Sequence, residues 1–163
     1  MTASTFPAQP EQRCFEDYRP GLMLEFGAAR VEEAEVIEFA RRYDPQPFHI
    51  DAEAAARGAF GGLIASGWHT GSLMMRLLVA HYLSPVASLG SPGIDELRWL
   101  APVRPGDTLT VRVTVLEARR SQTKPDRGLV RSQIDALNQR RETVMSMKAL
   151  NFILCREAVG TAA

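Results

Sequence analysis

The chain has 163 residues, the size of one ordinary domain, and 45% of them are hydrophobic, which is enough for one substantial core. Lysine plus arginine number 19, as do aspartate plus glutamate, so the formal net charge is zero. This balance argues against nucleic acid as a partner, because phosphate binding needs a basic surplus or a basic stripe. It also gives no polybasic signal for a membrane surface.

The cysteines and the N-terminal segment indicate a cytoplasmic protein with reduced thiols. Cys14 and Cys155 lie near opposite ends of the chain and belong to no CxxC or Cys/His cluster, so we expect no metal site. Residues 1–14 are polar and lack the apolar run of a signal peptide, and they predict a flexible tail before a single domain at 15–163. The most apolar stretch, residues 73–80, is short and contains an arginine, which excludes a membrane span.

The first half of the domain predicts one strand followed by helices. Residues 21–28 follow a turn-like Arg-Pro-Gly and are typical of a strand. Residues 32–43 have helical spacing, with glutamates in the first turn and arginines in the last, as the helix dipole favours. Four apolar residues form one stripe on this helix: Val36, Phe39, Ala40 and Tyr43. Residues 51–60 predict a short helix with Asp51 as its N-cap.

The longest helical candidate runs from residue 66 to residue 83. Apolar side chains cover most of its circumference, which is typical of a buried helix. Trp68, Met74 and Met75 are most simply core residues, although methionine can also line a pocket that accepts varied ligands.

The second half of the chain predicts strands. Residues 108–117 alternate between apolar and polar, and 129–138 and 143–154 have the same character. The turn sequences at 104–107 and 125–128 are too short for crossover helices, so the sheet should be mainly antiparallel. One long apolar helix against such a sheet is an α+β architecture.

Asp44 and His49 are the strongest candidates for chemistry. They lie just after the first helical stripe, on a connection stiffened by Pro45 and Pro47. A carboxylate and an imidazole can together hold one water and move its protons, as general acid–base catalysis requires. Gly67 opens the longest helix, where its N–H would be a free donor suited to a developing oxyanion. These three groups predict a hydration or dehydration site.

Asp44 and the three histidines also have interpretations without catalysis. Asp44 could simply cap the helix or form an Asx turn, and His49 could be a satisfied loop histidine; their spacing alone does not decide. We expect His69 to be a packed, hydrogen-bonded core histidine and His81 to interact with the C-terminal end of the helix dipole.

Three separated segments resemble the MaoC-like family of (R)-specific enoyl-CoA hydratases and acyl dehydratases. YDPQPFH is similar to the family's G-D-x-N-P-x-H motif, and FGGLIASGW to its small-residue loop that ends in His-Gly before a central helix. GIDELRWLAPVRPGDTL is similar to the strand–turn–strand that follows this helix. The resemblance extends in order from about residue 20 to about residue 155. Tyr43, Gln46 and Ser66 stand where many members have glycine, asparagine and histidine.

The resemblance implies a hot-dog fold, in which an antiparallel sheet wraps around the central helix. It further implies a homodimer, or an assembly of such dimers, because family members pair two units into a continuous sheet. Asp44 and His49 would activate the water, and the Gly67 N–H would bind the thioester oxygen. The residues expected to contact the substrate are Pro47, Phe48, Ala65, Ser66 and Trp68.

The activity implied by the resemblance is reversible hydration of trans-2-enoyl-CoA to (R)-3-hydroxyacyl-CoA. Coenzyme A is favoured over acyl carrier protein as the acyl carrier, and no metal or redox cofactor is needed. The arginines of the predicted strands are expected to be solvated; a less favoured alternative is that they contact the CoA nucleotide. These residues are Arg98, Arg119, Arg120, Arg140 and Arg141.

Two rival functions remain open at this point. A hot-dog acyl-CoA thioesterase also needs a carboxylate, but an Asp-x4-His pairing is not its usual signature. A non-catalytic acyl-binding or dimerisation module is disfavoured because both Asp44 and His49 are present. The acyl chain length and the roles of Ser66 and His69 do not follow from the sequence.

Overall fold

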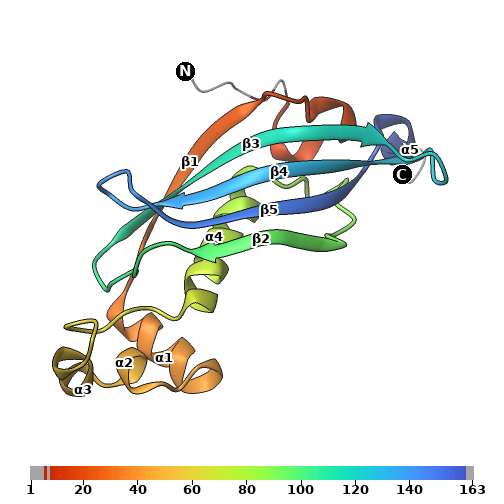
Figure 1. Cartoon of the computed structure of the whole chain (residues 1–163). Helices are drawn as coiled ribbons and strands as arrows, with labels where there is room; N and C mark the ends of the chain where they lie inside the picture. The colour runs from red at the N-terminus through yellow and green to blue at the C-terminus, as the bar shows by residue number, and fades with distance from the viewer. Residues whose placement is uncertain (1–5, 7, 161–163) are drawn as a thin grey trace.

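A computed structural model describes Phe6 and residues 8–160 of the chain. A curved antiparallel sheet of five strands, in the order β1-β3-β4-β5-β2, wraps around the helix α4 (Figure 1). The strands are β1 (Met23–Arg30), β2 (Gly93–Trp99), β3 (Thr108–Arg120), β4 (Arg127–Leu137) and β5 (Thr143–Leu154). The α-helices are α1 (Glu33–Tyr43), α2 (Pro47–Ile50), α3 (Ala52–Arg57), α4 (Gly67–His81) and α5 (Arg156–Gly160). This is the expected α+β architecture.

The core lies between the concave face of the sheet and one side of α4. Strand β3 shows how the sequence builds it, because every second side chain points to the same face of a strand. Its inward residues are almost fully buried: Leu109, Val111, Val113 and Val115. From α4, the buried apolar residues are Leu73, Met74, Leu77 and Leu78. The alternation in the sequence therefore predicted correctly which face of β3 is buried.

The other side of α4 is open in the single chain. Trp68 is 61% exposed, Met75 44% and Val79 58%, and their spacing of seven and four residues places them on one face. The prediction that this helix is buried on all sides, and that Trp68 and Met75 are core residues, is therefore wrong for the isolated chain. The sheet curves around only one side of the helix, and sequence hydrophobicity does not distinguish the two sides.

The segment before β1 already packs against the domain at residues that the sequence assigned to a flexible tail. Short 3-10 helices occupy Pro10–Gln12 and Phe15–Asp17, and Arg13 and Cys14 are buried. The guanidinium of Arg13 donates hydrogen bonds to the last carbonyls of α4, at 2.6 Å from His81 O. A cation therefore does interact with the C-terminal end of this helix, but it is Arg13, whereas the sequence suggested the side chain of His81. The predicted tail therefore does not extend to residue 14, and its residues 1–5 and 7 lie outside the described residues.

Helices α1 to α3 gather beyond one end of the sheet, near the N-terminal end of α4 (Figure 1). Asp44 directly follows α1, and His49 lies in α2. The fold thus brings these two residues close to the start of the central helix. Within the described part of the chain, no helix is both long and apolar enough to cross a membrane.

Candidate active site

Asp44 caps the C-terminal end of α1. Its backbone N–H still donates to Ala40 O at 2.8 Å, but its φ of −151° and ψ of 64° leave the helical region. Pro45 explains this break, because the residue before a proline is disfavoured in the α conformation. The chain then begins α2, a single turn with Pro47 at a first-turn position, where the missing N–H costs nothing. His49 therefore lies on a one-turn helix rather than in the stiff loop that the sequence suggested.

Asp44 and His49 face each other. His49 Nε2 lies 3.3 Å from Asp44 Oδ2, and His49 is 4% exposed. The other ring nitrogen, Nδ1, lies 2.7 Å from the carbonyl oxygen of Ile64. Because a carbonyl only accepts, Nδ1 carries the hydrogen, and Nε2 is left to exchange a proton on the side of Asp44. The two residues predicted to act together are therefore brought together by the fold.

Two further side chains hold the Asp44 carboxylate. Ser66 Oγ donates to Oδ2 at 2.6 Å, and Gln46 Nε2 donates to Oδ1 at 2.7 Å. These hydrogen bonds, first that of Ser66 and then that of Gln46, lower the pKa of Asp44, and the neighbouring His49 acts in the same direction. The carboxylate is thus kept ionised and fixed in orientation.

Gly67 is the first residue of α4 and lies against Trp99 of β2. A Cβ atom at this position would lie 2.5 Å from the indole ring, so the close approach requires glycine. Among the described residues, none accepts a hydrogen bond from the Gly67 N–H. This N–H is therefore a free donor at the positive end of the helix dipole.

These groups line one cavity of about 420 Å³. Asp44, His49 and Gly67 contribute the polar chemistry, and Phe60 and Trp99 contribute apolar wall. Of the residues expected to contact the substrate, Ala65 and Trp68 line this cavity, whereas three do not: Pro47, Phe48 and Ser66. Ser66 is fully buried, so its position corrects the expectation that it touches the substrate.

Sequence reasoning missed several cavity residues because they come from different elements. Phe60 follows α3, Trp99 ends β2, and Val103 lies in the connection to β3. Each falls inside a segment that resembles the family, but only the fold shows that they meet. Gln46 could have been found, since it lies two residues after Asp44 on a connection already considered functional.

His69 lies outside this cavity. It is 5% exposed, its ring stacks on Phe39 with centroids 5.0 Å apart, and burial lowers the pKa of its imidazole. It is packed, as expected, but its Nδ1 has no hydrogen-bond partner in the structure. Met74 is fully buried in the core, and Met75 is exposed on the open side of α4. Neither methionine lines the Asp44 cavity.

Three of the strand arginines already have partners. Arg140 pairs with Glu142, Arg141 pairs with Glu25, and Arg120 donates to the carbonyl of Pro125. These contacts agree with surface roles at strand ends. Across the described residues, no group of three or more histidine, cysteine, aspartate or glutamate side chains is arranged to hold a metal ion.

Comparisons with known proteins show which family this chain resembles. A family model described as a MaoC like domain matches residues 18–135. The solved structure of a MaoC-like dehydratase from Rhodospirillum rubrum has 44% sequence identity and a TM-score of 0.81, covering 88% of this chain and 98% of that one. The R-hydratase PhaJ1 from Pseudomonas aeruginosa has 27% identity and a TM-score of 0.67, covering 87% of this chain and 85% of that one.

Two curated sequences are also similar to this chain. Protein MaoC from Klebsiella aerogenes is 33% identical over 106 residues, which are 64% of this chain and 31% of that protein, so the chain matches about a third of that longer protein. An uncharacterised protein, YdeM from Bacillus subtilis, is 25% identical over 129 residues, 79% of this chain and 90% of that protein. The predicted hot-dog fold is confirmed by the structural matches. The chain belongs to the MaoC-like dehydratase domain family.

Proposed function

We propose that the protein catalyses the reversible addition of water to a trans-2-enoyl thioester, which gives an (R)-3-hydroxyacyl thioester, with coenzyme A as the acyl carrier. The observation that carries this proposal is the 3.3 Å approach of His49 Nε2 to Asp44 Oδ2 beside a cavity that Gly67 also lines. Family membership supports a hydratase or dehydratase, and similar solved proteins include (R)-hydratases.

The hydrogen-bond pattern suits a bound water. When the imidazole is neutral, the lone pair of His49 Nε2 faces the ionised Oδ2 of Asp44, so two acceptors point at each other. A water that donates one hydrogen to each atom satisfies both acceptors. Its oxygen lone pairs then remain free to attack.

The proposed addition balances without another reactant. The water oxygen bonds to C3 of the enoyl group, one water proton passes to the Asp44–His49 pair, and the C2=C3 electron pair moves toward the thioester oxygen. The Gly67 N–H stabilises the negative charge on that oxygen. The pair then returns a proton to C2, and because one pair serves both steps, the addition is syn. The reaction is redox-neutral, so we propose that no redox cofactor takes part.

The direct test is turnover of crotonyl-CoA and a longer trans-2-enoyl-CoA. Loss of the enoyl absorbance should occur without release of free thiol, and the product should be the (R)-3-hydroxyacyl thioester. Release of thiol instead would identify a thioesterase. The absence of both reactions across a range of acyl chain lengths would favour the non-catalytic binding module.

We also propose that a second copy of the chain covers the open side of α4. The exposed apolar residues on this side continue onto β2, which is an edge strand of the sheet. Trp68 of α4 and Trp99 of β2 join the two parts, with ring centroids 5.2 Å apart. Exposed apolar patches and unpaired edge strands both favour association, and β2 of two copies could continue one sheet.

A further inference from the structure

We propose that Arg104 is a positioning residue that fixes the Phe60 wall of the active-site cavity, and thereby influences which acyl groups the cavity accepts. The part about acyl groups rests on the function proposed above; the positioning itself does not. Arg104 lies in the connection between β2 and β3, 44 residues from Phe60 in the sequence. It does not line the cavity itself.

The loop that carries Phe60 has little structure of its own. It runs from Gly58 to Leu63, and Gly61 and Gly62 have φ values of 64° and 152°, in the region that glycine adopts more readily than other residues. Its one internal backbone hydrogen bond joins the Gly61 N–H to Gly58 O at 3.2 Å. Glycine loses more conformational freedom on folding than other residues, so a loop with three glycines is costly to order. External contacts must therefore hold Phe60 in place.

The guanidinium of Arg104 supplies such contacts. Its Nη2 donates to Phe60 O at 2.5 Å, and its Nη1 lies 3.5 Å from Leu63 O. Gly62 lies between these two carbonyls, and a Cβ there would be 3.4 Å from Nη1. The planar guanidinium thus spans the loop from Phe60 to Leu63, which the single ammonium of a lysine cannot do in the same way.

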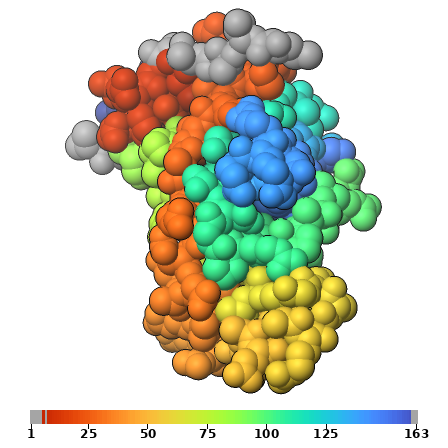
Figure 2. All heavy atoms as spheres, turned by 90° about the vertical axis from the view of Figure 1, so that its left-hand side faces the viewer, coloured from red at the N-terminus to blue at the C-terminus, as the bar shows by residue number. Residues whose placement is uncertain are grey.

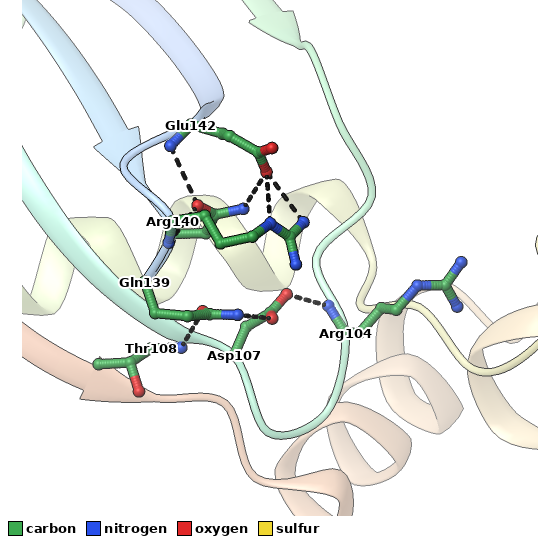
Figure 3. Close-up of polar contacts among 7 residues, drawn as sticks. Arg104, Asp107, Thr108, Gln139, Arg140 and Glu142 are labelled. Carbon is green, nitrogen blue, oxygen red and sulfur yellow. Dashed lines mark hydrogen bonds and ion pairs between the residues drawn. The ribbon is translucent and has the colours of Figure 1, made fainter.

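Arg104 is itself held on a rigid base. Its backbone N–H donates to Asp107 Oδ2 at 2.8 Å, while Gln139 Nε2 donates to the other carboxylate oxygen at 2.8 Å (Figure 3). Gln139 Oε1 in turn accepts from the Thr108 N–H at 3.0 Å. The turn that carries Arg104 is therefore fastened to the β4–β5 hairpin, and its guanidinium extends away from that network.

The space-filling view shows the same arrangement on the surface. The green segment around residues 100–107 lies between the blue tip of the β4–β5 hairpin and the yellow segment that contains the loop (Figure 2). The hairpin and turn therefore form a base on one side of the loop. Arg104 is the side chain that reaches from this base to the loop carbonyls.

Phe60 connects the loop to the catalytic pair. Its ring packs against Phe48 with centroids 5.3 Å apart, and the Phe48 ring meets His49 edge-on at 4.4 Å. A displaced Phe60 therefore changes the apolar wall and removes a neighbour of the ring that supports His49. The larger change should be in the wall, because His49 keeps its 2.7 Å contact with Ile64 O.

The experiment compares Arg104→Ala, Arg104→Lys, Phe60→Ala and the double variant Arg104→Ala/Phe60→Ala with the parent. Arg57→Ala is the matched control, since it removes an exposed arginine of the neighbouring helix α3 whose partner is Glu53. Amide hydrogen exchange is measured first, because it needs no ligand. Arg104→Ala should exchange faster at residues 58–65, and Arg57→Ala should not. Unchanged exchange in Arg104→Ala would overturn the proposal.

Ligand selection is measured through the chain's two tryptophans, Trp68 and Trp99, both of which line the cavity. Their fluorescence is titrated with butyryl-CoA and octanoyl-CoA, which bind without turnover, and KM and kcat are measured with the corresponding enoyl-CoA substrates. Arg104→Ala should change the ratio of the two dissociation constants by about tenfold, the lower end of what one methylene group is worth in an apolar pocket, with kcat for the short substrate nearly unchanged. Arg104→Lys should recover part of the parent ratio. A merely structural role would lower kcat for both substrates together.

The double variant decides whether Arg104 acts through Phe60. Its ratio of the two dissociation constants should equal that of Phe60→Ala alone, because the effects of substitutions at residues that act through one another are not additive. Additive effects would overturn the proposal. Acyl-pantetheine thioesters lack the nucleotide of CoA. If Arg104→Ala weakened the binding of acyl-CoA but not of acyl-pantetheine, the proposal would also be overturned, because Arg104 would then bind a nucleotide phosphate. If the parent hydrates no enoyl thioester, the proposed function fails, while hydrogen exchange and saturated acyl-CoA binding still test the positioning.

Discussion

Ser66 Oγ donates a 2.6 Å hydrogen bond to Asp44 Oδ2, across 22 residues of sequence. The same hydroxyl accepts from the Trp68 N–H at 3.3 Å and so caps the N-terminus of α4. One fully buried side chain therefore fixes the candidate base relative to the helix end that presents Gly67. This relationship links the two halves of the site.

Replacement of Ser66 by alanine should shift the pH profile of hydration. The hydrogen bond from Ser66 stabilises the ionised carboxylate and lowers the pKa of Asp44, so its loss should raise that pKa. In the proposed mechanism Asp44 must be ionised to hold the water, so the acidic limb of kcat/KM should move to higher pH. Ser66→Thr, which keeps the hydroxyl, should restore the limb.

The same variant should also lose stability through its cap, by about 1 kcal/mol. A carboxyl group whose folded-state pKa is lowered contributes stability above its unfolded pKa of about 3.9, and that contribution is lost as the pH falls through the folded-state value. The difference in melting temperature between parent and Ser66→Ala should therefore be larger near pH 7 than in acid. If Ser66→Ala lowered Tm but left the acidic limb of kcat/KM unchanged, Ser66 would act only as a helix cap.

Asp44→Asn and His49→Ala should each lower kcat by about a hundredfold or more, the usual range for general acid–base groups. Asp44→Asn removes the charge but keeps the shape, and His49→Ala removes the second contact to the water. If both groups hold one water, as proposed, the double variant should be little worse than the poorer single one. Product binding should change far less, and near-normal kcat in Asp44→Asn would contradict the mechanism.

Gly67→Ala should impair activity more than stability. The new methyl group would lie 2.5 Å from the Trp99 ring and must displace it, beside the N–H proposed to bind the thioester oxygen. Overpacking costs about 1–3 kcal/mol, but alanine recovers up to about 1 kcal/mol of helix propensity, so Tm should fall modestly. Steady-state kinetics should show at least a tenfold loss of kcat/KM, on the order expected when one oxyanion donor is disturbed.

Gly71→Ala provides the matched control for this variant. A methyl group there would meet only the flexible end of Met145, at 3.4 Å. This variant should therefore keep both its activity and its stability. Equal losses in the two glycine variants would mean that helix packing, rather than the Gly67 N–H, is responsible.

Val79→Glu should separate the proposed dimer. Val79 is 58% exposed on the open side of α4, and a charge there cannot be buried against a second apolar surface without a large desolvation cost. Light scattering should give the mass of two chains for the parent and of one chain for the variant. Val86→Glu makes the same change at an exposed valine outside α4 and β2, and it should leave the parent's mass unchanged. A parent that scatters as a monomer at micromolar concentration would contradict the dimer.

Much of the fold could be predicted because local patterns fix local structure. The alternation in residues 108–117 predicted the buried face of β3. The apolar stripe of α1 was predicted only in part, because Val36 and Ala40 are buried but Tyr43 is 63% exposed. The extent of α4 was also close, at 67–81 against a predicted 66–83. Its open side was not predictable, because apolar residues that face a sheet and those that face a second chain look alike in a sequence.

The sequence alone determined the chemistry available to this protein: a carboxylate and an imidazole five residues apart, with prolines that end one helix and begin the next. Proline acts through its own ring, so its effect on the backbone is local and readable. Only the tertiary structure decided how that chemistry is held. Ser66 reaches Asp44, Trp99 closes over Gly67, and Arg104 reaches the Phe60 loop, each between segments far apart in the chain. Such contacts depend on where the sheet and helices place each side chain, and no local pattern records that position.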